Sequence, residues 1–417
     1  MPGVVVLGGG STGEHFCGAL RRLDQDVPIT LVERSLVGGE CSYYACMPSK
    51  TLLRAPELQH AASRTPGVAA SALDTAEIFA WRDWMTSDWD DAGQAEWLAS
   101  QNVELVRGRG RVARPGVVEV DGRELDFDRL VVATGSSPAP HDFADAWTTN
   151  DATSSHEVPE SLIVVGGGVA GCELAQLYRR LGSEVTIVQR GERLLPRVDA
   201  EAAEVLQAAF EEEGIRLVFG ADGPGDLRAE RILVATGRRA NTEGLGLEQL
   251  GVEVGRRGIE TDETLRAADG VWAIGDCTGV AQFTHVGKYQ ARVAARNVAG
   301  GRAVADYRAI PAVAFTDPQI ATVGRIEGAT ARYDVESVPR ASTYERPARH
   351  GFLKVAADPE RRVVVGAVAV GPESGEWCQQ LTLAIRAEVP VDVLLDVIQP
   401  YPTFSEAVFF ALQELDL

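Results

Sequence analysis

The chain has 417 residues, and 40 lysines and arginines against 60 aspartates and glutamates give a formal net charge of −20. The length suits about three domains, and the acidic excess disfavours nucleic acid or an anionic membrane surface as a partner. No apolar run approaches the roughly 18 residues of a membrane span, and six cysteines are too few for a secreted disulfide framework. We therefore expect a cytoplasmic protein with no membrane partner.

The chain opens with a strand over 4–7, a glycine-rich turn over 8–13, a helix over 14–23 and a second strand over 29–32. In such a unit the first glycine allows the tight turn, the second lets a pyrophosphate approach the helix N-terminus, and the third lets helix and strand pack closely. Glu33 follows the second strand, where a carboxylate can bind an adenosine ribose. The residues predicted to hold this dinucleotide are Gly8, Gly10, Ser11, Thr12, Gly13 and Glu33.

A cysteine pair, Cys41 and Cys46, lies in the segment Gly38-Gly-Glu-Cys-Ser-Tyr-Tyr-Ala-Cys-Met-Pro-Ser-Lys50. Five residues of regular helix rise about 7.5 Å, beyond the roughly 4.4 to 6.8 Å usual between disulfide Cα atoms, so a bridge requires a distorted helix start. Such a bridge would be strained and reducible. A buried pair that never reacts is one alternative, and a metal site is another, although no second Cys or His pair supplies further ligands.

The opening pattern recurs as a strand over 162–165, a glycine turn over 166–171, a helix over 172–181 and a strand over 185–188. The second strand now ends in Gln189, and arginines follow it. Because a carboxylate there would repel a 2′-phosphate that arginines can pair with, the sequence favours NADPH over NADH. The arginines could instead be solvated surface residues. The residues predicted to hold the second dinucleotide are Gly166, Gly168, Gly171, Gln189, Arg190 and Arg193.

The rest of the chain completes an α/β organisation and adds a tail. Two similar strands, over 128–135 and 231–237, end in Ala-Thr-Gly, and another buried strand runs over 271–276. From about 304 the pattern changes to short strands over 312–315, 351–355 and 363–370 with a helix over 376–387, which predicts a separate α+β domain. We predict two Rossmann-type dinucleotide-binding domains, one from 1–148 with 265–303 and one from 149–264 that is trimmed around 220–230, followed by a C-terminal domain over 304–417.

Taken together, these motifs resemble the flavin-dependent pyridine nucleotide-disulfide oxidoreductases, the group of dihydrolipoamide dehydrogenase, glutathione reductase and mercuric reductase. The resemblance also includes Ile310–Pro318 and the terminal Pro402-Thr-Phe-Ser-Glu406. It implies that the first glycine turn binds FAD and the second the nicotinamide cofactor, and that the C-terminal domain forms a homodimer. Cofactor-binding residues that it adds are Gly39, Thr134, Gly135, Gly237, Gly275 and Asp276, the last toward the ribityl chain.

The resemblance also implies roles for the cysteines and two charged residues. Cys46 would face the flavin and Cys41 would exchange with the substrate, while Lys50 would pair with Glu173 near the flavin N5. Electrons would pass from NADPH through FAD to the disulfide and on to a small-molecule acceptor.

The chain departs from the family at Tyr401. Disulfide reductases of the family have a His-Pro-Thr-x-Ser-Glu stretch whose His is the acid-base catalyst and comes from the other subunit, whereas this chain has Tyr401 before its Pro-Thr-Phe-Ser-Glu406. A tyrosine, with a reference pKa of about 10 against about 6.5 for histidine, is a poor base at neutral pH. We predict Tyr401 and Glu406 at an active site shared across the dimer, although Tyr401 could simply pack at the interface.

The leading interpretation is an NADPH-dependent flavoenzyme acting on something other than a standard dithiol. Mercuric reductase also has a tyrosine at this point, but it delivers metal through a C-terminal cysteine pair, and the last hundred residues here contain only Cys378. The alternatives are a quinone reductase with direct electron transfer from the flavin, mercuric reductase-like metal reduction, and a redox sensor without turnover. We predict no bound metal ion.

Overall fold

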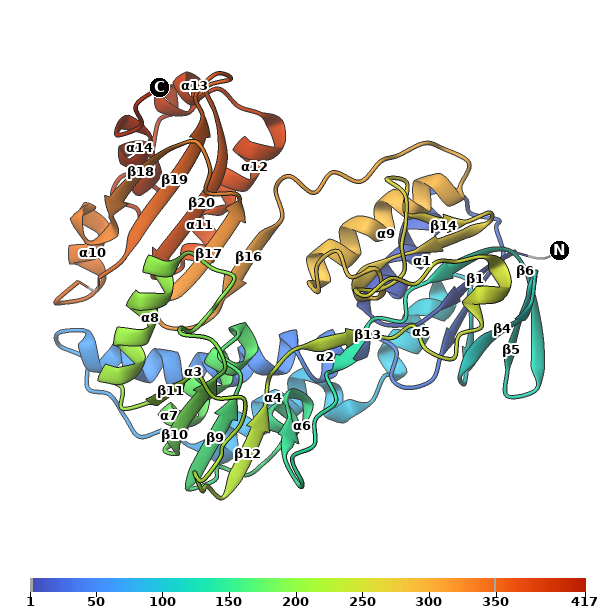
Figure 1. Ribbon diagram of the computed structural model, residues 1–417, viewed down its shortest axis with the longest axis horizontal. Helices are drawn as coiled ribbons and strands as arrows, with labels where there is room; N and C mark the ends of the chain where they lie inside the picture. Colours follow the sequence, from blue (N-terminus) through green and yellow to red (C-terminus); the bar gives the residue numbers. More distant parts are fainter. Residues whose placement is uncertain (1–2, 349) are drawn as a thin grey trace. The chain divides into compact units, whose positions relative to one another are not determined.

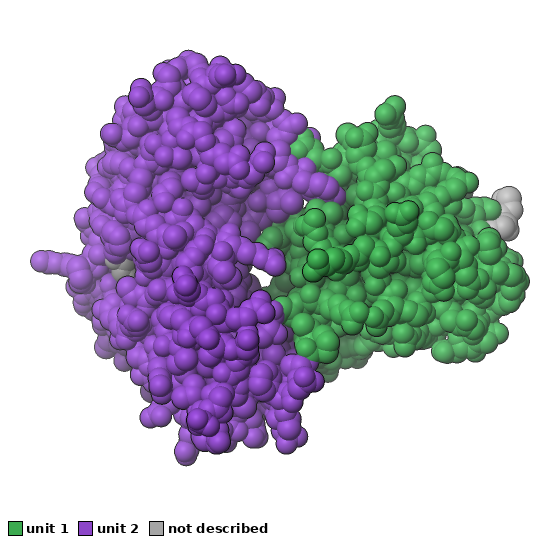
Figure 2. Space-filling view, in the orientation of Figure 1, with its two compact units in different colours: residues 1–49, 80–140, 237–306 green, residues 50–79, 141–236, 307–417 purple. Residues whose placement is uncertain are grey.

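The structure is a computed structural model, and it describes residues 3–348 and 350–417 (Figure 1). The chain forms two compact units, which are coloured separately in Figure 2. The first contains residues 1–49, 80–140 and 237–306, and the second contains residues 50–79, 141–236 and 307–417. The domain boundaries expected from the sequence divide the chain differently and stay a prediction.

The first unit contains an eight-stranded sheet whose main path runs β14-β15-β6-β1-β2-β3, with β4 and β5 continuing from β6. Neighbours from β15 to β3 along this path are parallel, whereas β14 is antiparallel to β15. The apolar run in β1 is buried, as expected for a central parallel strand. The strands are β1 (Gly3–Leu7), β2 (Ile29–Glu33), β3 (Val103–Arg107), β4 (Gly110–Arg114), β5 (Val117–Val120), β6 (Arg123–Val132), β14 (Arg266–Ala268) and β15 (Val271–Ala273).

Helices α1 and α9 pack against each other and bury a shared apolar stripe with this sheet. A separate antiparallel pair joins β7 (Ser136–Pro138) to β13 (Arg238–Ala240). Two helices, α3 and α4, begin in one unit and end in the other along the chain. The helical segments are α1 (Ser11–Leu23), α2 (Gly39–Tyr43), α3 (Cys46–Arg64), α4 (Thr75–Met85), η1 (Ser87–Trp89), α5 (Ala92–Ser100), η2 (Leu247–Leu250), η3 (Gly275–Thr278) and α9 (Thr284–Val298).

The second unit contains a five-stranded, wholly parallel sheet in the order β11-β10-β9-β12-β8. In the described chain, no strand lies between β11 and β12, where the sequence predicted a shortened connection. The elements are β8 (Trp147–Thr148), α6 (Thr149–Ser154), β9 (Ser161–Val165), α7 (Val169–Leu181), β10 (Glu184–Gln189), α8 (Ala200–Glu212), β11 (Arg216–Phe219) and β12 (Arg231–Val234).

The same unit ends in an antiparallel sheet in the order β16-β17-β20-β19-β18, covered in part by the last helices (Figure 1). Its elements are β16 (Pro311–Ala314), β17 (Gln319–Gly324), β18 (Ala329–Asp334), η4 (Val335–Ser337), α10 (Pro339–Tyr344), β19 (Phe352–Asp358), β20 (Val363–Gly371), α11 (Ser374–Trp377), α12 (Gln379–Ala387), α13 (Val391–Asp396) and α14 (Glu406–Gln413). Among the described residues, no helix combines the length and apolarity needed to cross a membrane.

The expected α/β class with an α+β tail is confirmed, and several element bounds need correction. Helices α1 and α7 begin inside the glycine motifs, because the Glu14 amide already bonds the Gly10 carbonyl (3.0 Å) and the Cys172 amide the Gly168 carbonyl (2.9 Å). The helix predicted over 376–387 is two helices that meet at Cys378. Strands β17 and β18 were not predicted, since their small and polar residues give no clear alternation.

Candidate active site

The first glycine turn has the close packing that its sequence predicted. Gly8 has a φ of +105°, and a Cβ added at Gly13 would lie 2.0 Å from the Gly8 carbonyl oxygen. The amides of Gly9 and Ser35 donate to the two carboxylate oxygens of Glu33, each at 2.7 Å. The first three residues of the turn, Gly8 to Gly10, thus form a cradle without side chains, and a fixed carboxylate closes one end. These features fit the pyrophosphate and ribose of a dinucleotide.

The second glycine turn repeats this geometry in the other unit. Gly166 has a φ of +112°, and a Cβ at Gly171 would lie 1.9 Å from the Gly166 carbonyl oxygen. The Gly167 amide donates to the side-chain oxygen of Gln189 at 2.9 Å. A Cβ at Gly168 would meet nothing within 4 Å, so open space lies in front of this turn.

The two arginines after β10 have different surroundings. Arg193 donates to the carbonyls of Val198 (2.9 Å) and Pro196 (3.1 Å), and so fixes its own loop. The Arg190 side chain is 83% exposed, and its guanidinium lies 3.7 Å from Asp222 in the β11–β12 connection. Arg190 is therefore the better placed of the two to meet a ligand, and a role for Arg193 in binding a nucleotide stays a prediction.

The two cysteines flank a break between helices. Cys41 lies in α2, and α3 begins at Cys46; between them the amides of Tyr44 and Ala45 both bond the Glu40 carbonyl, at 2.8 and 2.6 Å. This break is the distorted helix start that the spacing predicted. It places the two thiols within hydrogen-bonding distance of each other.

The surroundings of the thiols set their acidity. Hydrogen bonding to Cys46 and burial raise the pKa of Cys41, whereas a hydrogen bond from Thr284 and the positive charge of Lys288 lower it. The Thr284 hydroxyl lies 3.3 Å from the Cys46 sulfur. Sequence reasoning missed Thr284 and Lys288, because α9 reads only as an amphipathic helix.

The start of α2 packs directly on the first glycine turn. Gly39 has a φ of +61°, and a Cβ there would lie 2.8 Å from the Gly10 Cα. The Ser11 amide bonds the Gly38 carbonyl at 3.1 Å. The cysteine segment and the first glycine turn are therefore continuous within the first unit.

A polar cluster around Asp276 lies in the same unit. Its carboxylate accepts a hydrogen bond from the Ser136 hydroxyl at 2.6 Å, and Arg238 donates to that hydroxyl at 2.8 Å and pairs with Glu40. Burial raises the pKa of Asp276, although Ser136 and Arg238 oppose this shift. The sequence did not reveal Glu40 or Arg238 as members of the cluster.

Predicted residues of the strand ends lie beside this cluster. The Thr134 hydroxyl bonds the Asn241 carbonyl at 2.6 Å, and the Gly275 amide donates to the buried Gln290 side chain at 2.6 Å. Gly135 and Gly237 both have positive φ, which favours glycine at these turns.

The second unit brings Lys50 and Glu173 together. The Lys50 ammonium donates to one oxygen of the buried Glu173 carboxylate at 2.7 Å, and the Phe315 amide donates to the other at 2.9 Å. Lys50 also lies 4.7 Å from the centre of the Phe315 ring. A buried carboxylate thus orients one cation, and the contact between the two predicted partners is present.

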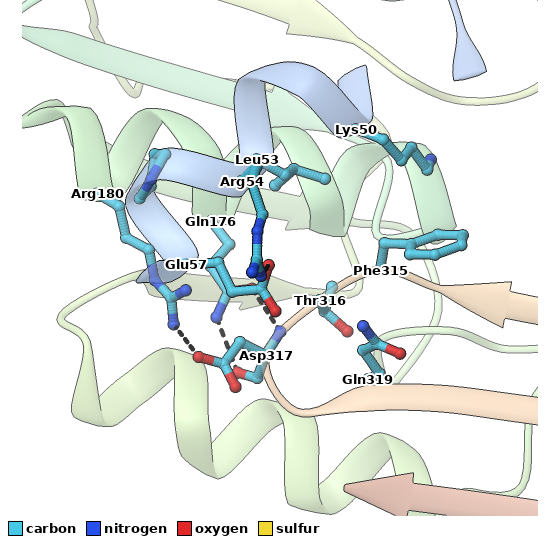
Figure 3. Close-up of a pocket in the computed structure, with 11 residues that line it drawn as sticks. Lys50, Leu53, Arg54, Glu57, Gln176, Arg180, Phe315, Thr316, Asp317 and Gln319 are labelled. Carbon is cyan, nitrogen blue, oxygen red and sulfur yellow. Dashed lines mark hydrogen bonds and ion pairs between the residues drawn. The ribbon is translucent and has the colours of Figure 1, made fainter. Parts of the chain in front are cut away.

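A cavity of about 210 Å³ adjoins this pair (Figure 3). One side is held by Asp317, whose carboxylate pairs with Arg180 at 2.8 Å and whose backbone exchanges two hydrogen bonds with Gln176. These polar groups bond one another, so they shape the cavity wall. Its lining residues are Lys50, Leu53, Arg54, Pro56, Glu57, Gln176, Arg180, Phe315, Thr316, Asp317 and Gln319.

The terminal residues singled out by the sequence lie in the second unit. Tyr401 is 74% exposed, whereas Glu406 is buried and accepts a hydrogen bond from the Thr403 amide at 3.1 Å. Glu406 therefore holds the turn that precedes α14. The Tyr401 ring is presented at the surface of its unit, beside a segment in which Ile398 is 93% exposed.

One group of possible metal ligands occurs in the described part of the chain. Asp334, Glu336 and His350 place three donor atoms within 4.8 Å of one another. Asp334 is already paired with Arg332 at 2.5 Å, and His350 is exposed. A neighbouring guanidinium disfavours a cation, so we assign no metal to this group.

Comparison with known proteins gives consistent matches over nearly the whole chain. A family model described as pyridine nucleotide-disulphide oxidoreductase matches residues 2–295, and the model of its dimerisation domain matches residues 310–411. Mercuric reductase of Bacillus cereus is 34% identical over 447 residues, which cover 98% of this chain and 70% of that protein. Dihydrolipoyl dehydrogenase of Thermus scotoductus is 34% identical over 452 residues, covering 99% and 97%. The crystal structure of LpdA from Mycobacterium tuberculosis is similar with a TM-score of 0.89 at 29% identity, covering 99% of both chains.

Proposed function

Because the chain belongs to the pyridine nucleotide-disulphide oxidoreductases, which are FAD-dependent enzymes that use pyridine nucleotides, we propose that it carries electrons from NADPH to Cys41 and Cys46. From there they pass to a small-molecule acceptor other than the disulfide form of a standard dithiol substrate. The observation that carries the proposal is the helix break that brings the two thiols into hydrogen-bond contact. A cytoplasmic location stays a prediction of the sequence.

The first unit supplies a site that fits FAD. The residues that would hold it are the Gly8–Gly13 turn at the pyrophosphate, Glu33 at the ribose and Asp276 at the ribityl hydroxyls. The cradle of the turn is lost if a Cβ is added at Gly13, which supports a ligand that must approach the backbone. The chemistry that FAD supplies when bound is the transfer of two electrons between a nicotinamide and a disulfide.

The charges at the second glycine turn support the proposal that the nicotinamide cofactor is NADPH. Gln189 is neutral, and the exposed Arg190 beside it can pair with a 2′-phosphate. Glu173 fixes the Lys50 ammonium, and we propose that this cation lies beside the nicotinamide and flavin rings when both are bound. Its test is Lys50→Met, which should slow reduction by NADPH while FAD content stays unchanged.

The cysteines complete the path of the electrons. Reduction opens the disulfide to two thiols. The hydrogen bond with Cys46 and burial raise the pKa of Cys41, and the positive charge of Lys288 opposes this shift. We propose that Cys41 is the thiol that exchanges with the acceptor. Thr284 holds the Cys46 sulfur in place. Tyr401 would meet the Cys41 side from the other subunit of a homodimer, where it can donate a hydrogen bond but is a poor base.

Anaerobic titration with NADPH tests the proposal. Alkylation with iodoacetamide before and after one equivalent of NADPH, read by mass spectrometry, should show new labelling at Cys41 and Cys46 and at no other cysteine. The buried Cys378 and Cys172 are internal controls. Unchanged labelling of the pair after the flavin is bleached would overturn the proposal.

Three alternatives differ from this proposal. In a quinone reductase, electrons would pass directly from the flavin to the quinone. Cys41→Ser would then leave the turnover of quinones and of all other acceptors unchanged. Mercuric reductase-like metal delivery finds little support here, because Cys378 is buried and burial raises its pKa to about 12. A redox sensor would be reduced by NADPH without turnover on any acceptor.

A further inference from the structure

Three side chains on one face of α7 bind a short segment that follows β16, residues 315–317, within the second unit. Glu173, Gln176 and Arg180 are three and four residues apart, so they lie on the same side of the helix. Glu173 binds the backbone at the start of the segment. Gln176 and Arg180 both bind Asp317 at its end (Figure 3). The 315–317 segment is therefore attached to α7 at both ends.

The attachment at Asp317 fixes its backbone as well as its side chain. The Gln176 side chain accepts a hydrogen bond from the Asp317 amide at 2.8 Å and donates one to the Asp317 carbonyl at 2.9 Å. Arg180 donates to the Asp317 carboxylate at 2.8 Å. The Glu213 carboxylate in turn accepts from Gln176 at 2.7 Å and from Arg180 at 2.7 and 2.9 Å. Gln176 is 1% exposed and the Arg180 side chain 9% exposed, so these hydrogen bonds lie away from competing water.

The other end of the segment sets the surroundings of Lys50. One oxygen of the Glu173 carboxylate accepts from the Phe315 amide at 2.9 Å, and the other accepts from the Lys50 ammonium at 2.7 Å. The Phe315 ring also lies 4.7 Å from that ammonium, measured to the ring centre. A shift of the Phe315 backbone would therefore move the carboxylate and the ring together, and with them the preferred position of the ammonium.

Packing alone does not fix Lys50 and Phe315. The Lys50 side chain is 37% exposed and Phe315 is 38% exposed, and both line the cavity of about 210 Å³ (Figure 3). A side chain beside open space loses contacts on that side, so fewer neighbours oppose its displacement. The position of Phe315 thus depends on how its backbone is attached, at Glu173 and, two residues later, at Asp317.

We propose that Gln176 and Arg180 are positioning residues for reduction by NADPH. Through Asp317 they hold the Phe315 backbone, which fixes the Lys50 ammonium. The inference rests on the proposed function, in which that ammonium lies beside the nicotinamide and flavin rings. NADPH gives up a hydride, which carries two electrons and one proton and hence one negative charge, and a cation held in place stabilises this charge where it arrives. Misplacing such a group by about 1 Å can lower a rate about 100-fold.

Rapid kinetics with the FAD-loaded protein tests this inference. Gln176→Met and Arg180→Met each remove hydrogen bonds to Asp317 and keep an unbranched side chain. We expect each to lower the limiting rate of flavin reduction by NADPH about 10-fold and to change the Kd for NADPH less than about 2-fold. Gln176→Glu can still accept from the Asp317 amide, and Arg180→Lys keeps the positive charge. These two conservative variants should therefore lie between the methionine variants and the wild type.

Tyr178→Phe is the matched control on the same helix. The Tyr178 hydroxyl donates to the Ala152 carbonyl at 2.8 Å in the interior. Tyr178 is two residues from Gln176, so it lies on another side of α7. Its loss removes a buried hydrogen bond and should lower the thermal midpoint. The limiting rate of flavin reduction should nevertheless stay within about 2-fold of the wild type.

The chemical reactivity of Lys50 gives a readout that does not depend on activity. The chain contains three lysines, Lys50, Lys288 and Lys354, so limited acetylation with acetic anhydride can be followed at each of them by mass spectrometry. Lys354 lies in the same unit and has its own ion pairs, so its labelling reports general loosening of that unit. In FAD-loaded protein without NADPH, Gln176→Met should raise the labelling rate of Lys50 several-fold relative to Lys354. The reason is that an ammonium released from a buried carboxylate is more accessible to the reagent.

Two results would overturn the positioning role. One is a limiting rate of flavin reduction within about 2-fold of the wild type in both methionine variants. The other is labelling of Lys50 that rises no more than that of Lys354. If a methionine variant does not fold, Gln176→Glu and Arg180→Lys undergo the same two measurements, and wild-type values in both variants overturn the inference.

The failure of this inference and that of the proposed function are distinguishable. If the positioning role fails, the proposed function still stands as long as NADPH opens Cys41 and Cys46 to alkylation in the wild type. If NADPH does not open them, the proposed function is wrong. The labelling of Lys50 then still decides whether Gln176 and Arg180 hold its ammonium, because that measurement uses no NADPH.

Discussion

The two glycine turns have similar backbone geometry, but one ends at a carboxylate and the other at a neutral carboxamide. In each turn, the backbone amide of the second residue donates a hydrogen bond to the side chain that ends the second strand. Gly9 donates to Glu33 at 2.7 Å, and Gly167 donates to Gln189 at 2.9 Å. A carboxylate and a carboxamide oxygen can both accept this hydrogen bond, and the charged carboxylate accepts it at the shorter distance. The hydrogen bond therefore fixes the turn in both cases. Under the proposed function, the charge of the accepting residue discriminates between a ribose hydroxyl and a phosphorylated ribose.

The largest expected effect comes from filling the turns. Gly13→Ala and Gly171→Ala each place a Cβ within about 2 Å of a backbone oxygen, and overpacking costs about 1–3 kcal/mol. We expect the first variant to lose FAD, measured by flavin absorbance, and the second to keep FAD but lose reduction by NADPH, measured by stopped flow. Gly93→Ala, where a Cβ meets nothing within 4 Å, is the control. Normal NADPH binding by Gly171→Ala would show that the turns are not equivalent.

The residue after the third glycine also differs, being Glu14 in one turn and Cys172 in the other. Burial raises the pKa of Glu14 from 4.5 to about 7, which corresponds to at most about 3 kcal/mol. Because the pKa of Glu14 is higher in the folded protein than in the unfolded chain, its contribution to the free energy of unfolding is fully present below about pH 4.5. This contribution is lost as the pH rises through 7. Glu14→Gln should therefore stabilise the protein more at pH 8.5 than at pH 5.5, measured by the urea midpoint.

An exposed glutamate supplies the control for this pH effect. Glu96→Gln should leave the pH dependence of the urea midpoint as in the wild type, because Glu96 is exposed. Identical midpoint changes for Glu14→Gln at both pH values would contradict the prediction.

Exchanging the strand-end residues tests the electrostatic difference directly. Gln189→Glu keeps the hydrogen bond to Gly167 but places a carboxylate near a 2′-phosphate, so kcat/KM for NADPH should fall about 10-fold. The value for NADH serves as the internal control and should not fall. Glu33→Gln should weaken FAD retention more mildly, measured by dialysis. If Gln189→Glu leaves the ratio of kcat/KM for NADPH to that for NADH unchanged, Gln189 does not discriminate between the two cofactors.

The smallest expected effect separates the two arginines after β10. Arg190→Met should lower kcat/KM for NADPH only about 3- to 5-fold, because a solvent-exposed ion pair between Arg190 and a 2′-phosphate contributes little binding energy. Arg193→Met should lower the thermal midpoint and leave the cofactor ratio unchanged, since Arg193 binds the Val198 and Pro196 carbonyls. The opposite pattern would make Arg193 the phosphate ligand.

Much of the fold was predictable because its signals are local. Apolar runs before glycine turns identified β1 and β9, and the spacing of Cys41 and Cys46 predicted the break between α2 and α3. The strands β17 and β18 were missed because the first is rich in small residues and the second carries polar ones, so neither shows a clear two-residue period. Their pairing with β20 and β19 is what makes them strands.

The sequence by itself determined the features that depend on residue type and spacing, namely both glycine turns, the cysteine pair and the charge difference between Glu33 and Gln189. Only the tertiary structure decided which distant side chains meet them. It assigned Thr284 and Lys288 to the thiols, and it showed that Arg193 bonds its own loop. The physical reason is that a side-chain contact across more than two hundred residues depends on how helices pack, and packing leaves no local pattern in the chain.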